Sequence, residues 1–201
     1  MKSYNTVVVN VMLGIRICLA FSQIEEMKKV KTFLAHQGFE IIDESTDGSS
    51  AIRRIRTLHP DLIIADSNLP GISGIRIAEI AEEDGIAPVI VITSMGSSLW
   101  INQENTNGII YLQRPITKAA LLQTIQLALI SYQKVMNLKK EIQKLKETLE
   151  DRKLIEKAKG IVMQKYNLSE NEAYRLIQKM SMNKGIPLRE LAKAILLAND
   201  L

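Results

Sequence analysis

Short apolar runs alternate with amphipathic segments along the first 130 residues. The apolar runs predict strands at residues 16–21, 39–43, 61–65, 88–92 and 108–112. Helical spacing of apolar positions predicts helices at residues 24–36, 47–58 and 75–83, and a further long helix after residue 115. Nearly continuous apolar strands separated by helices are typical of a parallel sheet that is covered on both faces. Right-handed crossovers then predict an α/β, doubly wound, flavodoxin-like domain of five strands, with its functional edge at the carboxyl ends of the strands.

A segment without Gly or Pro runs from residue 116 to residue 159 and predicts one long helix. Its apolar positions step by four and three, and the step from Val135 to Leu138 repeats a three, which predicts a local stammer. Heptad spacing with Lys and Glu beside the apolar seam indicates a parallel two-stranded coiled coil. The alternative is one long helix that packs back on its own first domain. The residues expected to form the homodimer are Tyr132, Val135, Leu138, Ile142, Leu145 and Leu149.

The last fifty residues predict three short helices packed as a small all-α bundle. Ser169, with Glu172 three residues later, forms a capping box that begins one helix, and Pro187 lies in the first turn of the next. The first helix contains Gly160, although Gly in a helix interior is about 1 kcal/mol less favourable than Ala. Such a residue is usually tolerated where a second helix or a ligand approaches the backbone closely.

This bundle resembles the ANTAR family, the domain of the AmiR and NasT transcription antitermination regulators. The matching residues are Ile155, Ala158, Lys159, Gly160 and Met163, then Leu168, Ser169, Glu172, Ala173 and Tyr174, and finally Leu188, Leu191, Ala192 and Ile195. The resemblance implies a domain that binds RNA, recognising paired stem-loops in nascent leader RNA so that a terminator does not form. Without the resemblance, the alternative is a helical dimerisation bundle in which Gly160 permits close packing.

The ANTAR-like motif also suggests which residues contact RNA. We expect Ala158 and Gly160 to offer a small surface against which a loop nucleotide lies, while Lys159 reaches a phosphate or a base edge. Charge and nearness to the motif add Lys157, Arg175 and Arg189. The candidate set is therefore Ala158, Lys159, Gly160, Lys157, Arg175 and Arg189. Tyr174 either stacks on a base or lies half-buried in the bundle, and the second position is favoured.

The N-terminal domain resembles a response-regulator receiver. Asp66 ends the third predicted strand and matches the phospho-acceptor position, and Thr93 ends the fourth strand where the family has the hydroxyl that senses phosphorylation. Phe21-Ser22 stands where the family has an acidic pair, and Arg114-Pro115 replaces the Lys-Pro pair.

These two differences from the receiver pattern affect whether Asp66 can be phosphorylated. Transfer of a phosphoryl group to an aspartate needs a divalent cation held by further carboxylates. Because Phe21-Ser22 replaces the acidic pair, Mg²⁺ binding is doubtful and no cofactor is expected; Glu25 and Glu26 lie too far into the next helix to substitute. We therefore expect a pseudo-receiver, in which Asp66 pairs with Arg114 and the domain serves as a scaffold or binds a sensory partner. The alternative is a phosphorylated two-component response regulator with relaxed requirements and a sensor kinase.

The net charge of +4 is unevenly distributed. Residues 134–201 contain 15 Lys and Arg against 9 Asp and Glu, a surplus of +6, whereas residues 1–133 carry −2. A positive surplus at one end is the pattern expected of a protein that binds a polyanion. A DNA-binding regulator is the rival interpretation, but the final helix, residues 187–198, carries only Arg189 and Lys193 for base reading.

The sequence contains no Ser/His/Asp or Cys/His arrangement and no phosphate-binding glycine loop, so we do not expect an enzyme. The single cysteine, Cys18, suits a reducing cytosol, and the isolated His36 and His59 predict no metal site. The apolar run at residues 6–21 falls short of the roughly 18 uninterrupted apolar residues of a membrane span. It is interpreted as one or two strands of a soluble, cytoplasmic protein.

These patterns divide the chain into four parts. They are an N-terminal extension at residues 1–14, a receiver-like domain at 15–130, a coiled-coil dimerisation helix at 131–151 and an ANTAR-like RNA-binding domain at 152–201.

Overall fold

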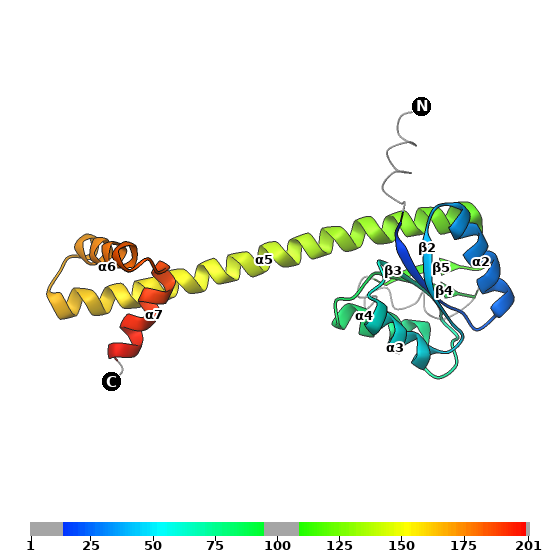
Figure 1. Ribbon diagram of the computed structural model, residues 1–201, viewed down its shortest axis with the longest axis horizontal. Coiled ribbons are helices and arrows are strands. Elements are labelled where there is room, and N and C mark those ends of the chain that lie inside the picture. Colours follow the sequence, from blue (N-terminus) through cyan, green and yellow to red (C-terminus); the bar gives the residue numbers. More distant parts are fainter. Residues whose placement is uncertain (1–13, 95–108, 200–201) are drawn as a thin grey trace, which may run out of the picture. The chain divides into compact units, whose positions relative to one another are not determined.

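The computed structural model describes residues 14–94 and 109–199. The possible extra strand before residue 14, and the poorly patterned stretch before the fifth strand, lie outside the described residues. In the first 113 residues the elements are β1 (Arg16–Ala20), α2 (Ile24–His36), β2 (Glu40–Ser45), α3 (Gly48–Leu58), β3 (Leu62–Asp66), α4 (Gly74–Glu83), β4 (Val89–Thr93) and β5 (Ile110–Gln113) (Figure 1). Each predicted strand and helix is therefore present, with ends shifted by one or two residues.

The five strands form one parallel sheet in the order β2-β1-β3-β4-β5. The order runs outward in both directions from β1 and β3, which confirms the doubly wound, flavodoxin-like fold. β3 and β4 lie in register with Asp66 opposite Ile92. Because all strands are parallel, Asp66, Thr93 and Arg114 come to the same edge of the sheet, where the carboxyl ends of β3, β4 and β5 meet.

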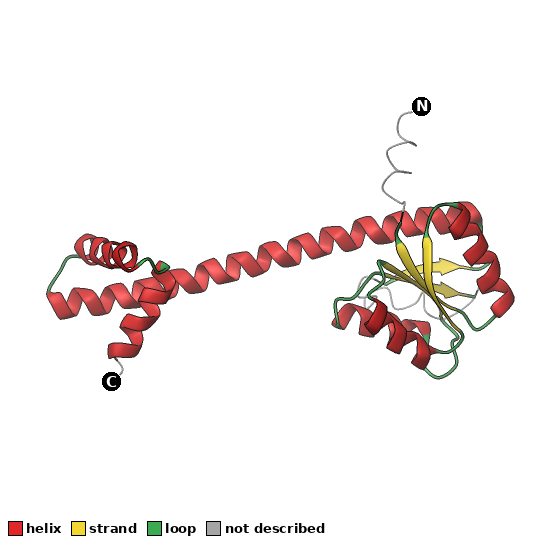
Figure 2. Cartoon of the chain, in the orientation of Figure 1, coloured by secondary structure: helices red, strands yellow, loops and turns green. Residues whose placement is uncertain are grey.

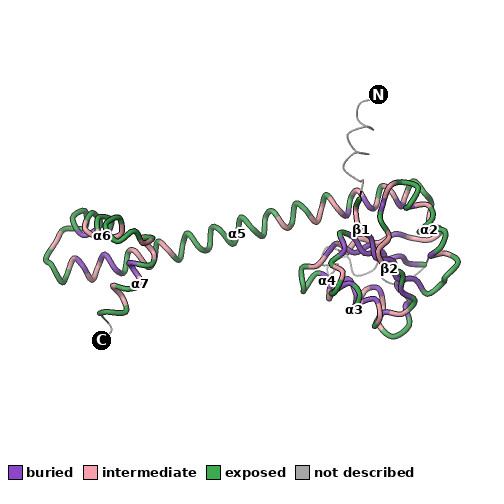
Figure 3. The backbone as a smooth tube through the Cα atoms, viewed as in Figure 1, coloured by how far each residue is buried: buried purple, intermediate pink, exposed green. Residues whose placement is uncertain are grey.

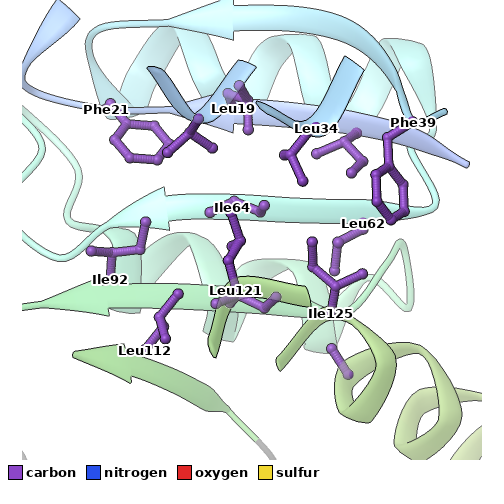
Figure 4. Packing of buried hydrophobic residues seen from close by; sticks show 14 of the residues in the cluster. Leu19, Phe21, Leu34, Phe39, Leu62, Ile64, Ile92, Leu112, Leu121 and Ile125 are labelled. Carbon is purple, nitrogen blue, oxygen red and sulfur yellow. The ribbon is translucent and has the colours of Figure 1, made fainter. Parts of the chain in front are cut away.

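Two apolar layers cover the two faces of this sheet. On one face, side chains of α2 and of the first turns of the long helix pack against β1, β3 and β4, as Figure 4 shows for Leu34, Leu121 and Ile125. On the other face, α3 and α4 pack through Ala51, Ile55 and Ile77. Cys18 lies in this second layer, where burial raises the pKa of its thiol to about 12, so the thiol is unreactive at neutral pH.

The long helix α5 (Lys118–Tyr166) changes its surroundings along its length. Leu121, Ile125 and Ala128 are buried in the receiver-like domain, and the Tyr132 hydroxyl donates a hydrogen bond to the Gly85 carbonyl at 3.0 Å. Farther along, Val135, Leu138, Ile142, Leu145 and Leu149 are exposed. Figure 3 shows the same change as a mostly exposed stretch in the middle of α5. The predicted stammer is therefore the point at which one apolar stripe ends and another begins. Tyr132 belongs to the first stripe, which packs on its own domain.

The end of α5 forms a small bundle with α6 (Glu170–Lys184) and α7 (Leu188–Asn199) (Figure 2). Its core contains Ala158, Val162, Ala173, Ile177, Leu191 and Ala192. The predicted capping box is present at the start of α6, where the Glu172 carboxylate accepts a hydrogen bond from the Ser169 N–H at 2.9 Å. The chain divides into two compact units, residues 1–135 and 136–201. None of the helices in the described residues is both long and apolar enough to cross a membrane.

Candidate receiver site and nucleic-acid interface

Asp66 is the last residue of β3 and is only 2% exposed. The turn that follows it leads to the start of α4 at Gly74, and it brings the Gly74 backbone close against the end of β3. A Cβ atom at Gly74 would overlap the backbone carbonyl of Asp66, so the close approach requires glycine. The carboxylate is thus held at the functional edge of the sheet, at the position predicted for it.

Three neighbours donate hydrogen bonds to the Asp66 carboxylate. They are the Ser22 hydroxyl at 2.5 Å, the Asn68 N–H at 3.2 Å and the Arg114 guanidinium, whose Nη1 lies 3.2 Å from Oδ1. Burial is the largest single influence and opposes ionisation, but these donors together lower the pKa of Asp66 below its ordinary value. The predicted pairing of Asp66 with Arg114 is confirmed, with Nη2 3.0 Å from Oδ2.

Arg114 is shared between two carboxylates. Its Nη2 also donates to Glu26 at 2.6 Å, and its Nε lies 3.1 Å from the second Glu26 oxygen. The hydrogen bonds to Glu26 are the main reason that the pKa of Arg114 is raised. The sequence predicted only that Glu26 lies too far along its helix to substitute for the acidic pair. It did not predict this ion pair, for which α2 brings the Glu26 carboxylate to the guanidinium. Glu26 nevertheless contributes by neutralising Arg114 and makes no contact with Asp66 among the interactions of the described residues.

The side chains around Asp66 do not fit a divalent cation of the kind that receivers hold. Phe21 offers no oxygen and is fully buried in the apolar layer beneath α2. Arg114 contacts both Asp66 oxygens, so a metal ion would have to displace a guanidinium. Thr93 lies nearby at the end of β4, and its buried hydroxyl makes no hydrogen bond within the described ranges. The edge is occupied by an internal ion pair instead of a metal-binding set of carboxylates.

In the bundle, the Ala158-Lys159-Gly160 motif is arranged differently from the expectation. Ala158 is fully buried in the bundle core, and Lys159 is only 7% exposed. The Lys159 ammonium lies 2.5 Å from Glu156 on its own helix and 2.8 Å from Glu170 at the start of α6. These two carboxylates, Glu156 first, raise the pKa of Lys159. Lys159 therefore connects α5 to α6 with its ammonium paired inside the protein, and its contact with RNA stays a prediction.

This placement predicts a stability effect. We expect Lys159→Ala to lower the melting temperature of the bundle by a few degrees, because it removes a buried aliphatic stem and leaves Glu156 and Glu170 near each other without a cation. Lys157→Ala is the matched control, since Lys157 is exposed and makes no ion pair within the described chain. Thermal unfolding followed by circular dichroism measures both. Equal melting temperatures for the two variants would show that Lys159 has no structural role.

Gly160 faces away from the bundle core. A Cβ atom built at this position meets no other atom within 4 Å. Packing within the described chain therefore gives no reason for a glycine here. The open space leaves room for something outside the chain, either an RNA backbone or a second copy.

In the bundle the carboxylates have partners, whereas many of the cations do not. All five carboxylates in residues 151–199 have partners: Glu156 and Glu170 hold Lys159, Glu172 caps α6, Asp151 pairs with Arg189 at 3.1 Å and Glu190 with Lys193 at 3.3 Å. The Asp151–Arg189 pair is an ion pair only, since Asp151 Oδ1 and Arg189 Nε make no hydrogen bond. The cations of the same range that form no ion pair are Arg152, Lys157, Lys165, Arg175, Lys179 and Lys184.

The predicted RNA-contacting cations differ in whether they already form an ion pair within the protein. Lys157 and Arg175 are exposed and available, whereas Arg189 is committed to Asp151. The other unpaired cations of the described bundle, which were not among the residues predicted from the sequence, are Arg152, Lys165, Lys179 and Lys184. For Lys179 a usable signal existed, because helical spacing places it on the side of α6 opposite the core residues Ala173 and Ile177.

Comparisons with known proteins agree with this architecture. The family model described as a response regulator receiver domain matches residues 23–126, and the one described as an ANTAR domain matches residues 143–196. The chain is 31% identical to the transcriptional regulatory protein PdtaR of Mycobacterium tuberculosis over 81% of this chain and 80% of that one. It is 41% identical to the nitrate regulatory protein of Klebsiella oxytoca over 28% of this chain and 14% of that one. The signal receiver domain of a Luxo repressor protein from Vibrio parahaemolyticus superposes with a TM-score of 0.54 at 26% identity, covering 63% and 97% of the two chains.

Proposed function

Because the chain belongs to the response regulators that join a receiver to an ANTAR domain, a family of regulatory proteins, we propose that it is a transcription antiterminator that binds paired stem-loops in leader RNA. The observation that carries this proposal is the charge pattern of the bundle. Its carboxylates are engaged within the protein, while six cations are left without an ion pair in the described residues. Such a surface attracts the phosphates of a nucleic acid. A protein that acts on nascent leader RNA in this way would work in the cytoplasm.

The structure favours RNA over duplex DNA. A helix-turn-helix regulator reads the major groove with the side chains of one recognition helix. The final helix, α7, carries Arg189 and Lys193, and both are tied to carboxylates of the bundle. Its other side chains include the buried Leu191 and Ala192. No cation of α7 is left over for base reading in the part of the chain that the structure describes.

The experiment that tests this proposal compares two ligands. Full-length protein is titrated with a tandem-hairpin RNA and with a DNA duplex of equal phosphate number, across a series of salt concentrations. We expect tighter binding to the hairpins, with an affinity that falls linearly on a log–log plot against salt. Equal affinity for the two ligands would indicate nonspecific attraction to a polyanion. Tighter binding to the duplex would support the DNA-binding alternative.

We also propose that the receiver-like domain acts without phosphorylation of Asp66. The guanidinium of Arg114 contacts both oxygens of that carboxylate, and Phe21 supplies no metal ligand. The ion pair thus stands where a phosphorylated receiver needs a free carboxylate and a divalent cation. Signals would then reach the protein through a partner that binds this domain.

The proposal predicts the outcome of a phosphorylation assay. Incubation with acetyl phosphate and Mg²⁺ is expected to leave the mass of the intact protein unchanged. The double variant Ser22→Asp with Arg114→Lys restores one acidic residue and the lysine of the receiver pattern, so it tests whether the departures are the reason. A gain of one phosphoryl group by the wild-type protein, lost in Asp66→Asn, would contradict the pseudo-receiver interpretation.

The exposed stripe of α5 supports a homodimer. Val135, Leu138, Ile142, Leu145 and Leu149 step alternately by three and four, so they occupy the a and d positions of one uninterrupted heptad pattern. β-Branched Val135 and Ile142 take a positions, with Leu138 and Leu145 at d, and this distribution favours two parallel strands. We propose that a second copy covers this stripe, which excludes Tyr132. Two bundles would then be available for two hairpins.

A further inference from the structure

We propose that the outward face of α6 is the surface that reads the loop of an RNA hairpin, an inference that rests on the proposed function. This α6 face consists of Asn171, Tyr174, Arg175, Gln178, Lys179 and Met182. The Ala158-Lys159-Gly160 motif would then contribute mainly to the folding of the bundle and to the open space at Gly160.

The α6 face is exposed because of the position of the bundle core. Its residues recur every three or four positions, so they share one side of the helix. The opposite side carries Ala173, Leu176, Ile177 and Met180, which pack in the core. On the outward side Tyr174 is 41% exposed and Met182 is 75% exposed. Tyr174 is therefore close to the half-buried position predicted for it, and its exposed part is accessible to a ligand.

The polar groups of the α6 face are not used inside the protein. Asn171, Tyr174, Gln178 and Lys179 make no hydrogen bond or ion pair with any described residue. Arg175 has only the electrostatic attraction that helps to lower the pKa of Glu172, after the hydrogen bonds that Ser169 donates to that carboxylate. Solvated faces of ordinary helices mix carboxylates with lysines, but the α6 face contains no carboxylate. Both acidic residues of α6 lie in its first turn.

This combination of side chains fits an unpaired nucleotide loop. An exposed tyrosine ring supplies a stacking platform for a base, and Arg175 and Lys179 lie one turn apart to hold its phosphates. Asn171 and Gln178 carry amides that both donate and accept hydrogen bonds, as the edges of bases require. The stem of an A-form hairpin has a narrow major groove that side chains do not enter, so the loop is the part with free bases. A protein partner would instead have to supply carboxylates for both cations.

The test uses the full-length chain and a pool of tandem-hairpin RNAs with constant stems and randomised loops. Tyr174→Ala is expected to weaken binding by roughly 5- to 100-fold, the effect of losing one stacked base, while Tyr174→Phe keeps wild-type affinity. Lys179→Ala is expected to reduce the log–log salt slope by about 0.7 to 0.9, as for one phosphate contact. Lys29→Ala is the control, because it removes the same charge from an exposed helical position of the receiver-like domain, where Lys29 makes no ion pair with any described residue.

Sequencing the bound loops separates base reading from phosphate contact. We expect Asn171→Ala and Gln178→Ala to change which loop sequences are selected, whereas Lys179→Ala weakens binding without altering the selection. Far-ultraviolet circular dichroism confirms that each variant keeps its helices, as expected for exposed positions.

The outcomes distinguish the two proposals. If wild-type protein retains no hairpin RNA from the pool, the proposed function itself fails. If wild-type protein binds but Tyr174→Ala and Lys179→Ala behave like Lys29→Ala, the proposed function stands and the assignment of the α6 face is overturned. Loss of binding in Tyr174→Phe as well as in Tyr174→Ala would show that the hydroxyl is required, and would overturn the stacking role.

Discussion

Leu145→Lys is expected to convert the dimer into monomers and to weaken binding to a tandem-hairpin RNA by about 100-fold or more. Leu145 lies in the middle of the exposed stripe of α5 and is 62% exposed in the single chain. In a parallel coiled coil it would face its own copy, so the substitution would bury two like charges against each other. Removing an unpaired ammonium from water costs several kcal/mol, which is enough to prevent pairing of a short coil.

The effect on RNA binding follows from linkage of the two bundles. Once one hairpin is bound, the second bundle of a dimer meets the second hairpin at a high effective concentration, which raises the overall affinity without any new contact. A monomer loses this advantage although each of its bundles is unchanged. A single-hairpin RNA should therefore bind the variant and the wild type alike, and this comparison isolates the contribution of dimerisation.

Ile24→Lys provides the matched control, since it places the same charge at an exposed apolar residue of α2, far in sequence from the stripe. Light scattering measures the mass of each variant, and the salt concentration is held constant during RNA titration. A Leu145→Lys protein that remains a dimer would place the interface elsewhere, for instance on the receiver-like domain. A monomer with undiminished affinity for tandem hairpins would contradict paired recognition.

The long helix illustrates what periodicity can and cannot predict. The apolar spacing identified a helix running well beyond the first domain and a seam suited to pairing. It could not show that Leu121, Ile125 and Ala128 face the sheet while Leu138 and Ile142 face outward. Both stripes obey the same three-and-four spacing, and only tertiary packing reveals that the partner changes after Tyr132. A stammer was therefore inferred from two regular patterns placed end to end.

The receiver edge was predictable because a parallel sheet brings the ends of its strands together. Asp66 at the end of β3 and Arg114 just after β5 could be paired on topology alone. The role of Glu26 could not, because its reach depends on how α2 turns over the sheet and on the length of the arginine side chain.

The burial of Lys159, the lysine of the ANTAR motif, could not be predicted for a related reason. Sequence places Lys159 in a helix that is rich in charge, and most lysines in such helices are solvated. Its burial depends on α6 returning to bring Glu170 within 2.8 Å, eleven residues later in the chain. Ion pairing across a helix–helix contact carries no local signal in the sequence. The motif thus identified the domain but gave no sign that its lysine is buried.

Arg114→Ala is expected to lower the free energy of unfolding of the receiver-like domain by about 3 kcal/mol, within the range found when one partner of a buried ion pair is removed. Asp66 is 2% exposed in the wild type, and in the variant its carboxylate keeps only the Ser22 hydroxyl and the Asn68 N–H as donors. Its pKa should therefore rise, because burial would no longer be opposed by a cation. Hydrogen exchange at the amides of β3 and β4 in the full-length chain measures the change.

A second substitution shows whether the loss of stability in Arg114→Ala comes from the unpaired Asp66 carboxylate. Asp66→Asn in the Arg114→Ala background removes the unpaired carboxylate, so the double variant should be more stable than Arg114→Ala alone. In the wild type, the lowered pKa of Asp66 means that its contribution is present above its ordinary pKa of 3.8 and is lost as pH falls through the lower value in the folded state. Arg114→Ala should weaken or reverse this pH dependence, whereas Arg114→Lys, which keeps a cation, should preserve most of it. If the double variant is less stable than Arg114→Ala, the carboxylate is stabilising without its cation and the ion pair does not hold this edge of the sheet together.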